Sequence, residues 1–192
     1  ALDNGMTVKL LLEQVREIRS VVSIPVVLMS YLNPLLQYGI EKFFREAAAS
    51  GADGLIVPDL PPDEFNAAYK NLADSLHLAV IFLIAPTTPE DRIRTLDAFS
   101  TGFVYAVSSS GTTGIKKQFS PAQEQYFQNL KAMNLKNPFL IGFGISDQPT
   151  FSTACRFASG AIVGSAFINL LKESDNFEED IHEFVYKLKS KH

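Results

Sequence analysis

The sequence lacks the features that would tie it to a membrane, a nucleic acid or an oxidising compartment. Its one cysteine, Cys155, excludes an internal disulfide and favours a reducing compartment. No apolar run reaches the roughly 18–20 residues that span a bilayer, and no basic-then-apolar leader is visible. The net charge is −4, with Lys and Arg scattered along the chain, which argues against nucleic-acid or anionic-membrane partners. We therefore expect a soluble, cytoplasmic protein.

Linkers, charge blocks and low-complexity tracts are also lacking, so we expect residues 1–192 to form a single domain. The chain instead alternates short apolar runs with amphipathic segments. Because the runs are almost continuously apolar, both faces of each strand should be buried, as in a parallel sheet covered by helices. The six expected strands are VVLM (26–29), GLIV (54–57), AVIFLI (79–84), FVYAV (103–107), FLIGF (139–143) and AIVG (161–164).

Helix signals lie between these strands. Thr7 is an expected N-cap, Gly51 an expected C-terminal stop, and Thr88 an expected N-cap with Pro89 at the first helical position. Ser120 and Gln123 have the spacing of a capping box. The expected helices cover about 8–18, 40–50, 61–75, 89–99, 121–133, 146–158 and 177–188.

Polar and glycine-rich loops follow nearly every strand, rather than gathering at one point. They read SYLNP, PDLPP, APTTP, SSSGTTG, GFGISD and GSA. Loops around a whole rim favour an α/β fold of the (βα)8 TIM-barrel class over a doubly wound open sheet. Six strands do not close such a barrel, so we expect the barrel to be N-terminally incomplete, with two strands before Ala1.

Three of these loops suggest a phosphate site. Gly114, Gly144 and Gly164-Ser165 supply backbone N–H groups that can approach an anion closely. Ser165 adds a hydroxyl near the start of a helix, where the macrodipole favours negative charge. The alternative for any single loop is that glycine merely turns the chain after a buried strand. Three successive loops together favour phosphate.

The segments PVVLMSYLNPLLQYG, GADGLIVPDLPPDE, APTTPEDR, FVYAVSSSGTTG and LIGFGISDQP, in this order, closely resemble the tryptophan synthase alpha subunit family. The resemblance runs over essentially the whole chain and implies a (βα)8 barrel. It also implies retro-aldol cleavage of indole-3-glycerol phosphate to indole and glyceraldehyde 3-phosphate. The family works beside a beta subunit that carries pyridoxal phosphate, so no cofactor is expected in this chain.

The resemblance assigns residues to two sites. The substrate site is implied to contain Met29, Tyr31, Tyr105, Thr113, Gly114, Phe143, Gly144, Gly164 and Ser165. The rim facing the beta subunit is implied to contain Asn33, Pro34, Asp59 and Pro61.

Several of these residues have simpler explanations. Met29 and Phe143 could be ordinary core residues, and Tyr105 a buried tyrosine that needs one hydrogen-bond partner. Asp59 could cap the helix that follows it, and Cys155 is expected to be a small core residue. His77, His182 and His192 lack metal-ligand spacing, so no metal is expected.

The resemblance leaves the acid–base chemistry outside this sequence. The family uses a glutamate at the end of its second strand and an aspartate in the loop after it, and both motifs would precede Ala1. We therefore expect no catalytic acid or base in this chain. Ser109 also stands where the family usually has arginine, and a lost guanidinium suggests weaker loop closure and slower cleavage.

Two alternatives remain open at this point. One is an alpha subunit with little or no activity that acts mainly as an allosteric partner of the beta subunit, for which Ser109 is the argument. The other is a sugar-phosphate isomerase or epimerase on a similar barrel. The YLNP and VPDLPP rim argues against the isomerase, since a solitary enzyme has less use for it.

Overall fold

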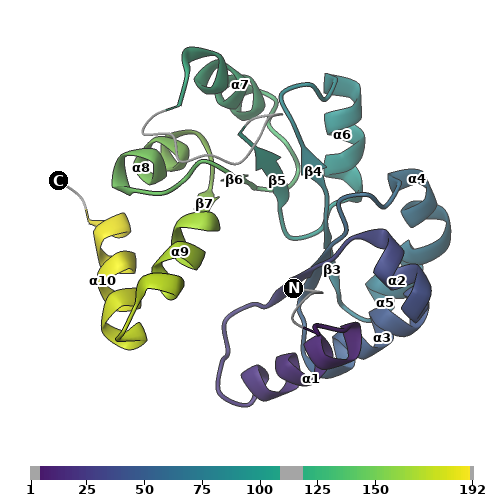
Figure 1. Cartoon of the computed structure of the whole chain (residues 1–192). Helices are drawn as coiled ribbons and strands as arrows, with labels where there is room; N and C mark the ends of the chain where they lie inside the picture. Colours follow the sequence, from purple (N-terminus) through teal and green to yellow (C-terminus); the bar gives the residue numbers. More distant parts are fainter. Residues whose placement is uncertain (1–4, 109–118, 191–192) are drawn as a thin grey trace. The chain divides into compact units, whose positions relative to one another are not determined.

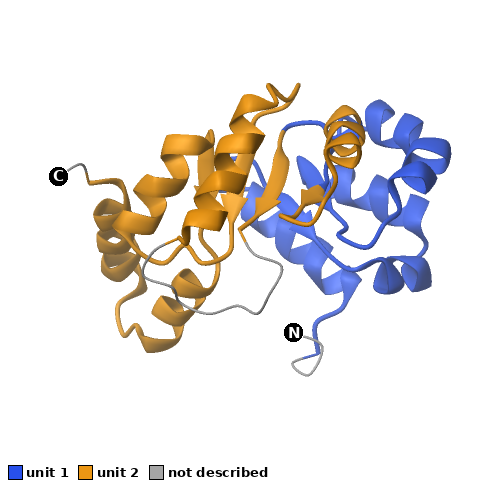
Figure 2. Ribbon diagram, turned by 90° about the horizontal axis from the view of Figure 1, so that it is seen from above, with its two compact units in different colours: residues 1–82, 99–102 blue, residues 83–98, 103–192 orange. Residues whose placement is uncertain are grey.

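The computed structural model of the chain describes residues 5–108 and 119–190, in which parallel strands alternate with helices (Figure 1). The chain forms two compact units, coloured separately in Figure 2. One contains residues up to Phe82 together with Phe99–Gly102, and the other contains Leu83–Ala98 and the residues from Phe103 onward. That the chain is one barrel domain stays a prediction.

The first unit contains a three-stranded parallel sheet in the order β1-β2-β3. The strands are β1 (Val27–Met29), β2 (Gly54–Ile56) and β3 (Ala79–Ile81). Each is only three residues long, so backbone ladder bonds alone hold little of the sheet. Buried side chains supply the rest, including Leu28, Leu55 and Val80 on the strands.

Helices connect and cover these strands: α1 (Val8–Arg19), α2 (Leu32–Tyr38), α3 (Ile40–Ser50), α4 (Pro62–Glu64), the π-helical η2 (Phe65–Tyr69) and α5 (Lys70–Ser75). The expected N-cap Thr7 and the expected C-terminal stop Gly51 are both confirmed. The Thr7 hydroxyl accepts from the amide of Leu10, and Gly51 ends α3 in the left-handed conformation, with φ of 94°. The expected helix 61–75 forms, but with a π-helical middle. The segment expected as a loop after β1 is largely helix α2, so that expectation is wrong.

The second unit contains a four-stranded parallel sheet in the order β4-β5-β6-β7. The strands are β4 (Leu83–Ile84), β5 (Val104–Val107), β6 (Phe139–Gly142) and β7 (Gly160–Ile162). The expected strand 79–84 is therefore two strands, β3 and β4, interrupted at Phe82. The amide of Phe82 donates to the hydroxyl of Ser100 instead of to a neighbouring strand, which explains the interruption.

The helices of the second unit are α6 (Glu90–Phe99), α7 (Pro121–Ala132), α8 (Gln148–Phe157), α9 (Ser165–Glu173) and α10 (Phe177–Lys189). The capping box of Ser120 and Gln123 is confirmed at α7. Thr88 is not an N-cap, because α6 begins at Glu90 and the Thr88 hydroxyl accepts from the amide of Ala85 at 2.9 Å. That bond closes a turn after β4 instead.

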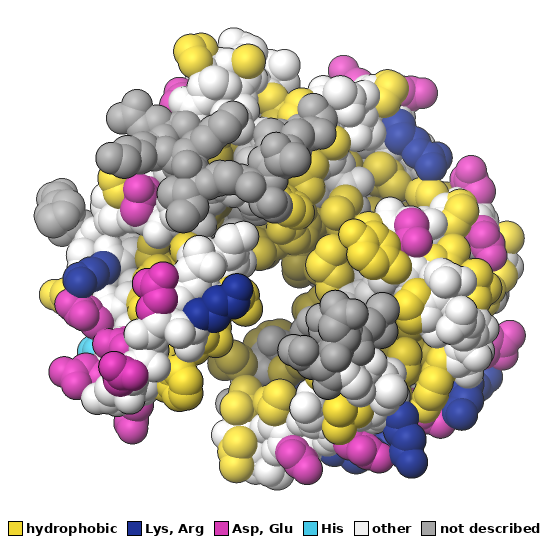
Figure 3. Space-filling view, in the orientation of Figure 1, with side chains coloured by type: hydrophobic (Ala, Val, Ile, Leu, Met, Phe, Trp, Pro, Cys, Tyr) yellow, Lys and Arg dark blue, Asp and Glu magenta, His cyan; other side chains and the backbone are white. Residues whose placement is uncertain are grey.

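The surface of α8 and α10 corrects one expectation and explains one pattern. Cys155 is exposed, because the neighbouring Ala154 is the position of α8 that faces the core. Acidic side chains gather over α10 in Figure 3, and its first turn contains Glu178, Glu179 and Asp180. Their charges stabilise the helix N-terminus through the macrodipole. Within the described residues, no helix has the length and apolar content to cross a bilayer.

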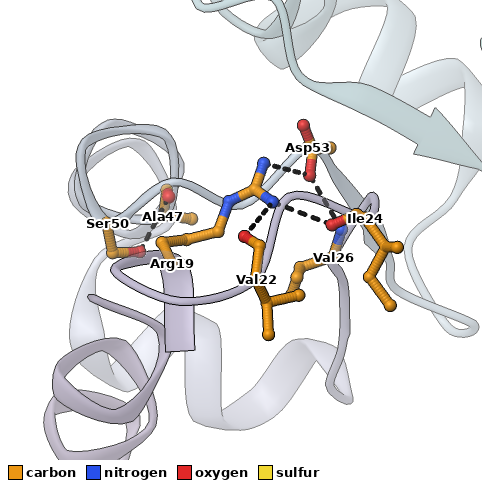
Figure 4. Close-up of polar contacts among 7 residues, drawn as sticks. All are labelled: Arg19, Val22, Ile24, Val26, Ala47, Ser50 and Asp53. Carbon is orange, nitrogen blue, oxygen red and sulfur yellow. Dashed lines mark hydrogen bonds and ion pairs between the residues drawn. The ribbon is translucent and has the colours of Figure 1, made fainter. Parts of the chain in front are cut away.

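A cluster centred on Arg19 holds the amino end of β1 (Figure 4). The Arg19 guanidinium donates to Asp53 Oδ2 at 2.7 Å, to the Ile24 carbonyl at 2.8 Å and to the Val22 carbonyl at 3.3 Å. The same carboxylate oxygen accepts from the amide of Val26 at 2.7 Å. The end of α1, the segment before β1 and the turn before β2 are thereby joined through one side chain.

Candidate functional site

The carboxyl ends of β5, β6 and β7 lie in register at one edge of the four-stranded sheet. Val107 pairs with Gly142, and Gly142 pairs with Ile162. Gly144 and Gly164 each follow their strand's last paired residue by two positions. The sheet therefore brings two of the three predicted phosphate-binding loops to the same edge, as the (βα)8 expectation requires.

Phe143 occupies an unusual position at this edge. Its φ of 68° lies in the left-handed region, which bulky side chains rarely adopt. Its side chain is 40% exposed, and its ring centroid lies 6.0 Å from that of Tyr105. The exposure argues against the simpler explanation of Phe143 as a core residue, and a strained exposed aromatic at a strand end is a candidate for ligand contact.

Tyr105 is buried on β5, and its phenol lies against the backbone of Gly142. A Cβ at position 142 would stand 2.2 Å from the Tyr105 hydroxyl, so only glycine admits this packing. Burial raises the pKa of Tyr105, since the phenolate would be poorly solvated there. Tyr105 is thus a neutral, buried ring that packs at a tilt against the Phe143 ring.

The N-terminus of α9 has the properties that the phosphate hypothesis requires. Gly164 precedes the helix, no side chain caps it, and Ser165 is its exposed first residue. Within the part of the chain that the structure describes, no side chain accepts from its first-turn N–H groups, and the macrodipole favours an anion there. Phosphate binding by Gly144, Gly164 and Ser165 stays a prediction. Thr113, Gly114 and Ser109 lie outside the described residues.

The first unit holds the other predicted ring contacts. Met29 ends β1 and is 51% exposed, and Tyr31 follows at 67% exposed. Exposure of this size argues against Met29 as core. Both residues lie at the carboxyl end of β1, where ligand-binding groups of such folds occur.

The predicted partner rim is brought together by one hydrogen bond. Asp59 Oδ1 accepts from the amide of Leu32, the first residue of α2, at 2.8 Å. Asp59 therefore caps α2, and not the helix that follows it as the simpler explanation proposed. Asn33 and Pro34 lie in the first turn of α2. Asn33, Asp59 and Pro61 are exposed, as an interface in a free subunit would be.

Sequence reasoning missed three residues that shape this site. Gly142 accommodates Tyr105, the Ser108 hydroxyl donates to the Phe143 carbonyl at 2.7 Å, and the Gln123 amide donates to the Ser108 carbonyl at 2.8 Å. The capping-box spacing pointed to Gln123, but only as a helix signal. In the described ranges, no three His, Cys, Asp or Glu residues are grouped to hold a metal ion.

Comparison with known proteins identifies the family. The family model described as "Tryptophan synthase alpha chain" matches residues 1–192. The tryptophan synthase alpha chain of Parabacteroides distasonis is 49% identical over 189 residues, covering 98% of this chain and 74% of that protein. That of Flavobacterium johnsoniae is 47% identical over 189 residues, with the same coverage of both chains. The chain belongs to the tryptophan synthase alpha chain family.

Solved tryptophan synthase structures from Pyrococcus furiosus agree. One of the α2β2 complex matches with a TM-score of 0.86 and 33% identity, covering 98% of this chain and 76% of that chain. One of the alpha subunit alone matches with a TM-score of 0.85 and 33% identity. The predicted (βα)8-barrel class is confirmed. Membership in the tryptophan synthase alpha chain family also disfavours the alternative of a sugar-phosphate isomerase or epimerase.

Proposed function

We propose that this chain performs the alpha-subunit reaction of tryptophan synthase, the cleavage of indole-3-glycerol phosphate to indole and glyceraldehyde 3-phosphate. The observation that carries the proposal is the 49% identity to a tryptophan synthase alpha chain over 98% of this chain. The strand-end residues described above are of the kinds that such a substrate needs. They offer backbone amides for a phosphate and aromatic rings for an indole.

The phosphate would be held by backbone amides. Gly144 and the N-terminus of α9, at Gly164 and Ser165, offer backbone N–H donors. Gly114 and Thr113 would complete this part of the site. Hydrogen bonds from backbone N–H groups are directional, so they would fix the orientation of the phosphate as well as attract its charge.

The indole ring would be recognised by aromatic and apolar surface. In the second unit, Phe143 and Tyr105 form one packed pair; in the first unit, Met29 at the end of β1 and Tyr31 two residues further on are exposed. Stacking and edge contacts between aromatic rings favour a flat indole over the glycerol chain. The neutral phenol of Tyr105 suits this task, because a phenolate would demand solvent.

Cleavage breaks the bond between the indole ring carbon and the first glycerol carbon. The ring carbon takes up a proton, and the glycerol hydroxyl loses one as its carbon becomes the aldehyde. A general acid and a general base are therefore required. We assign neither role to a residue of this chain. The residues named here serve in binding and positioning.

We propose that Asn33, Pro34, Asp59 and Pro61 form the surface that faces a beta subunit. Asp59 and the first turn of α2 are joined by the bond to Leu32, so the rim is one structural element. Pyridoxal phosphate would be held by that partner, where it would serve the joining of indole to serine. We further propose a cytoplasmic location, as for other enzymes of amino-acid biosynthesis.

One assay tests the reaction and its main alternative. Indole release from indole-3-glycerol phosphate is measured with the complete alpha subunit, alone and with a tryptophan synthase beta subunit, and the beta subunit's own rate is measured in parallel. Indole release supports the lyase. Activation of the beta subunit without indole release supports the allosteric alternative. The absence of both effects would contradict the proposal.

Ser109 defines a variant for the same assay. If its replacement of the family's arginine weakens closure of the site, Ser109→Arg should raise the rate of indole release. Turnover typical of the family, together with no change in the variant, would rule this hypothesis out.

A further inference from the structure

We propose that Ser108 and Gln123 are positioning residues that set the Phe143 ring for indole binding. The inference rests on the proposed function, since it concerns the ring contact of that site. It starts from the backbone of Phe143. The backbone of Phe143 is strained, because its φ of 68° is unfavourable for phenylalanine. Surrounding contacts must therefore hold it in this conformation.

Ser108 provides those contacts. Its side chain is almost fully buried, at 2% exposed, and its hydroxyl donates to the Phe143 carbonyl at 2.7 Å. Its backbone amide donates to the Gly142 carbonyl at 3.0 Å. Ser108 therefore holds the carbonyls of two successive residues of the turn. Because these two bonds fix the peptide groups on both sides of the Phe143 Cα, they fix the direction in which its ring leaves the backbone.

Gln123 holds Ser108 in turn. Its side-chain Nε2 donates to the Ser108 carbonyl at 2.8 Å, while its Oε1 accepts from the amide of Ser120 at 2.9 Å. One side-chain amide thus caps α7 with its oxygen and fixes the end of β5 with its nitrogen. A helix cap alone needs only the oxygen.

These bonds form one continuous path within the second unit. It runs from the first turn of α7 through Gln123 and Ser108 to Phe143, whose ring then packs on Tyr105. Loss of either link would leave the Phe143 carbonyl or the Ser108 carbonyl without that partner. The ring would then sample other directions, and the indole contact would weaken while the sheet beneath stays paired.

The amide of Gln123 allows its two roles to be separated. Gln123→Glu keeps an oxygen for the Ser120 amide and places a negative charge in the first turn of α7, which the macrodipole favours. It replaces the donor to Ser108 by an oxygen. The matched control, Ser120→Ala, removes the capping hydroxyl and its own bond to Gln123 Oε1 at 3.0 Å, but leaves the Ser120 amide bonded to that oxygen and the Gln123 donor to Ser108 in place.

The test measures ligand affinity and stability on the same variants. The ligands are indole-3-glycerol phosphate and indole alone, followed by their own fluorescence, because the chain contains no tryptophan. Stability is compared through the urea concentration at the midpoint of unfolding. We expect Gln123→Glu and Ser108→Ala to weaken the binding of both ligands by about tenfold, because the Phe143 ring would hold the binding direction only about a tenth of the time. Gln123→Glu should keep the wild-type midpoint, and Ser120→Ala should lower the midpoint but keep the affinities.

A Phe143→Gly background distinguishes positioning from a general structural effect. Glycine adopts the left-handed conformation freely and has no ring to aim, so Gln123→Glu should weaken the ligands no further there. An equal tenfold loss in that background would overturn the inference. So would wild-type affinity in both Gln123→Glu and Ser108→Ala. If the wild-type chain binds neither ligand, the proposed function fails and this inference fails with it.

Discussion

Two aspartates flank β2, and their surroundings differ in an instructive way. Asp53 precedes the strand and Asp59 follows it, and each accepts a hydrogen bond from a backbone amide, one just before β1 and the other at the start of α2. Asp53 accepts from Val26 at 2.7 Å, and Asp59 accepts from Leu32 at 2.8 Å. Asp53 is also paired with Arg19, whereas Asp59 is exposed at the predicted partner rim.

The difference suggests that the amino ends of β1 and β2 serve stability, whereas their carboxyl ends serve function. At the amino end, Arg19 has three acceptors and a side chain that is only 23% exposed. Its stem also packs where Gly51 lacks a side chain, since a Cβ there would stand 2.6 Å from Arg19 Cγ. At the carboxyl end, a single bond to an exposed carboxylate leaves the rim open to a partner. Barrels of this class divide their two faces in the same way.

The largest effect on stability is expected for Arg19→Met. Methionine keeps the apolar stem but removes all three hydrogen bonds, so the free energy of unfolding should fall by about 2–3 kcal/mol. Arg16→Met, an exposed position of the same helix, is the control and should change stability by less than about 0.5 kcal/mol. Urea unfolding measures both. If the two variants lost the same free energy of unfolding, the Arg19 cluster would have no special role in stability.

A smaller loss is expected at Asp53. Asp53→Ala should cost about 1–2 kcal/mol, because it removes the acceptor for Val26 as well as the ion pair. Asp53→Asn keeps an acceptor and should cost about half as much. The Asp53 side chain is 43% exposed, so added salt should weaken the ionic part. Indistinguishable stability of the two variants would mean that the Val26 bond contributes nothing.

Alkaline pH should act on Tyr105 and spare the Arg19 cluster. Burial raises the pKa of Tyr105 in the folded chain, while the unfolded chain titrates near about 10. Stability from its neutral phenol is therefore complete below that pH and is lost as pH rises through the folded pKa. The free energy of unfolding should decline as the pH rises above about 10, and the decline should be smaller in Tyr105→Phe. Arg19→Met should leave the decline unchanged, because arginine stays charged throughout.

The smallest effect on stability is expected for Asp59→Ala. Loss of an exposed helix cap should cost about 0.5–1 kcal/mol. The affinity for a beta subunit should nevertheless fall by about tenfold or more, if the rim faces that partner. Calorimetric titration measures this affinity, and Glu64→Ala, an exposed acidic position of α4, serves as the control. Unchanged affinity for Asp59→Ala would place the interface elsewhere.

Local signals explain which parts of the fold the sequence could predict. Thr7, Gly51 and the Ser120–Gln123 box act within four residues, and all three predictions are confirmed. Helix α2 was missed because its cap, Asp59, is 27 residues away from Leu32. The interruption at Phe82 depends on Ser100, 18 residues further along the chain. Such partners are known only once the chain has folded.

The candidate site shows the same limit. The positions of Phe143, Gly144 and Gly164 just after strands could be predicted, because each follows directly on an apolar run, whereas their ligand contacts stay predictions. The role of Ser108 could not, since its hydroxyl meets a carbonyl 35 residues away. The prediction that Cys155 is buried was wrong, because helical spacing did not reveal that Ala154 takes the buried position.

Hydrogen exchange at two amides tests the division between the two ends of β1 most directly. The amides of Val26 and Leu32 are followed in the free chain and with a beta subunit bound. We predict slow exchange at Val26 in both states, and faster exchange at Leu32 that slows when the partner binds. Protection gained at Val26, with Leu32 unchanged, would contradict the account.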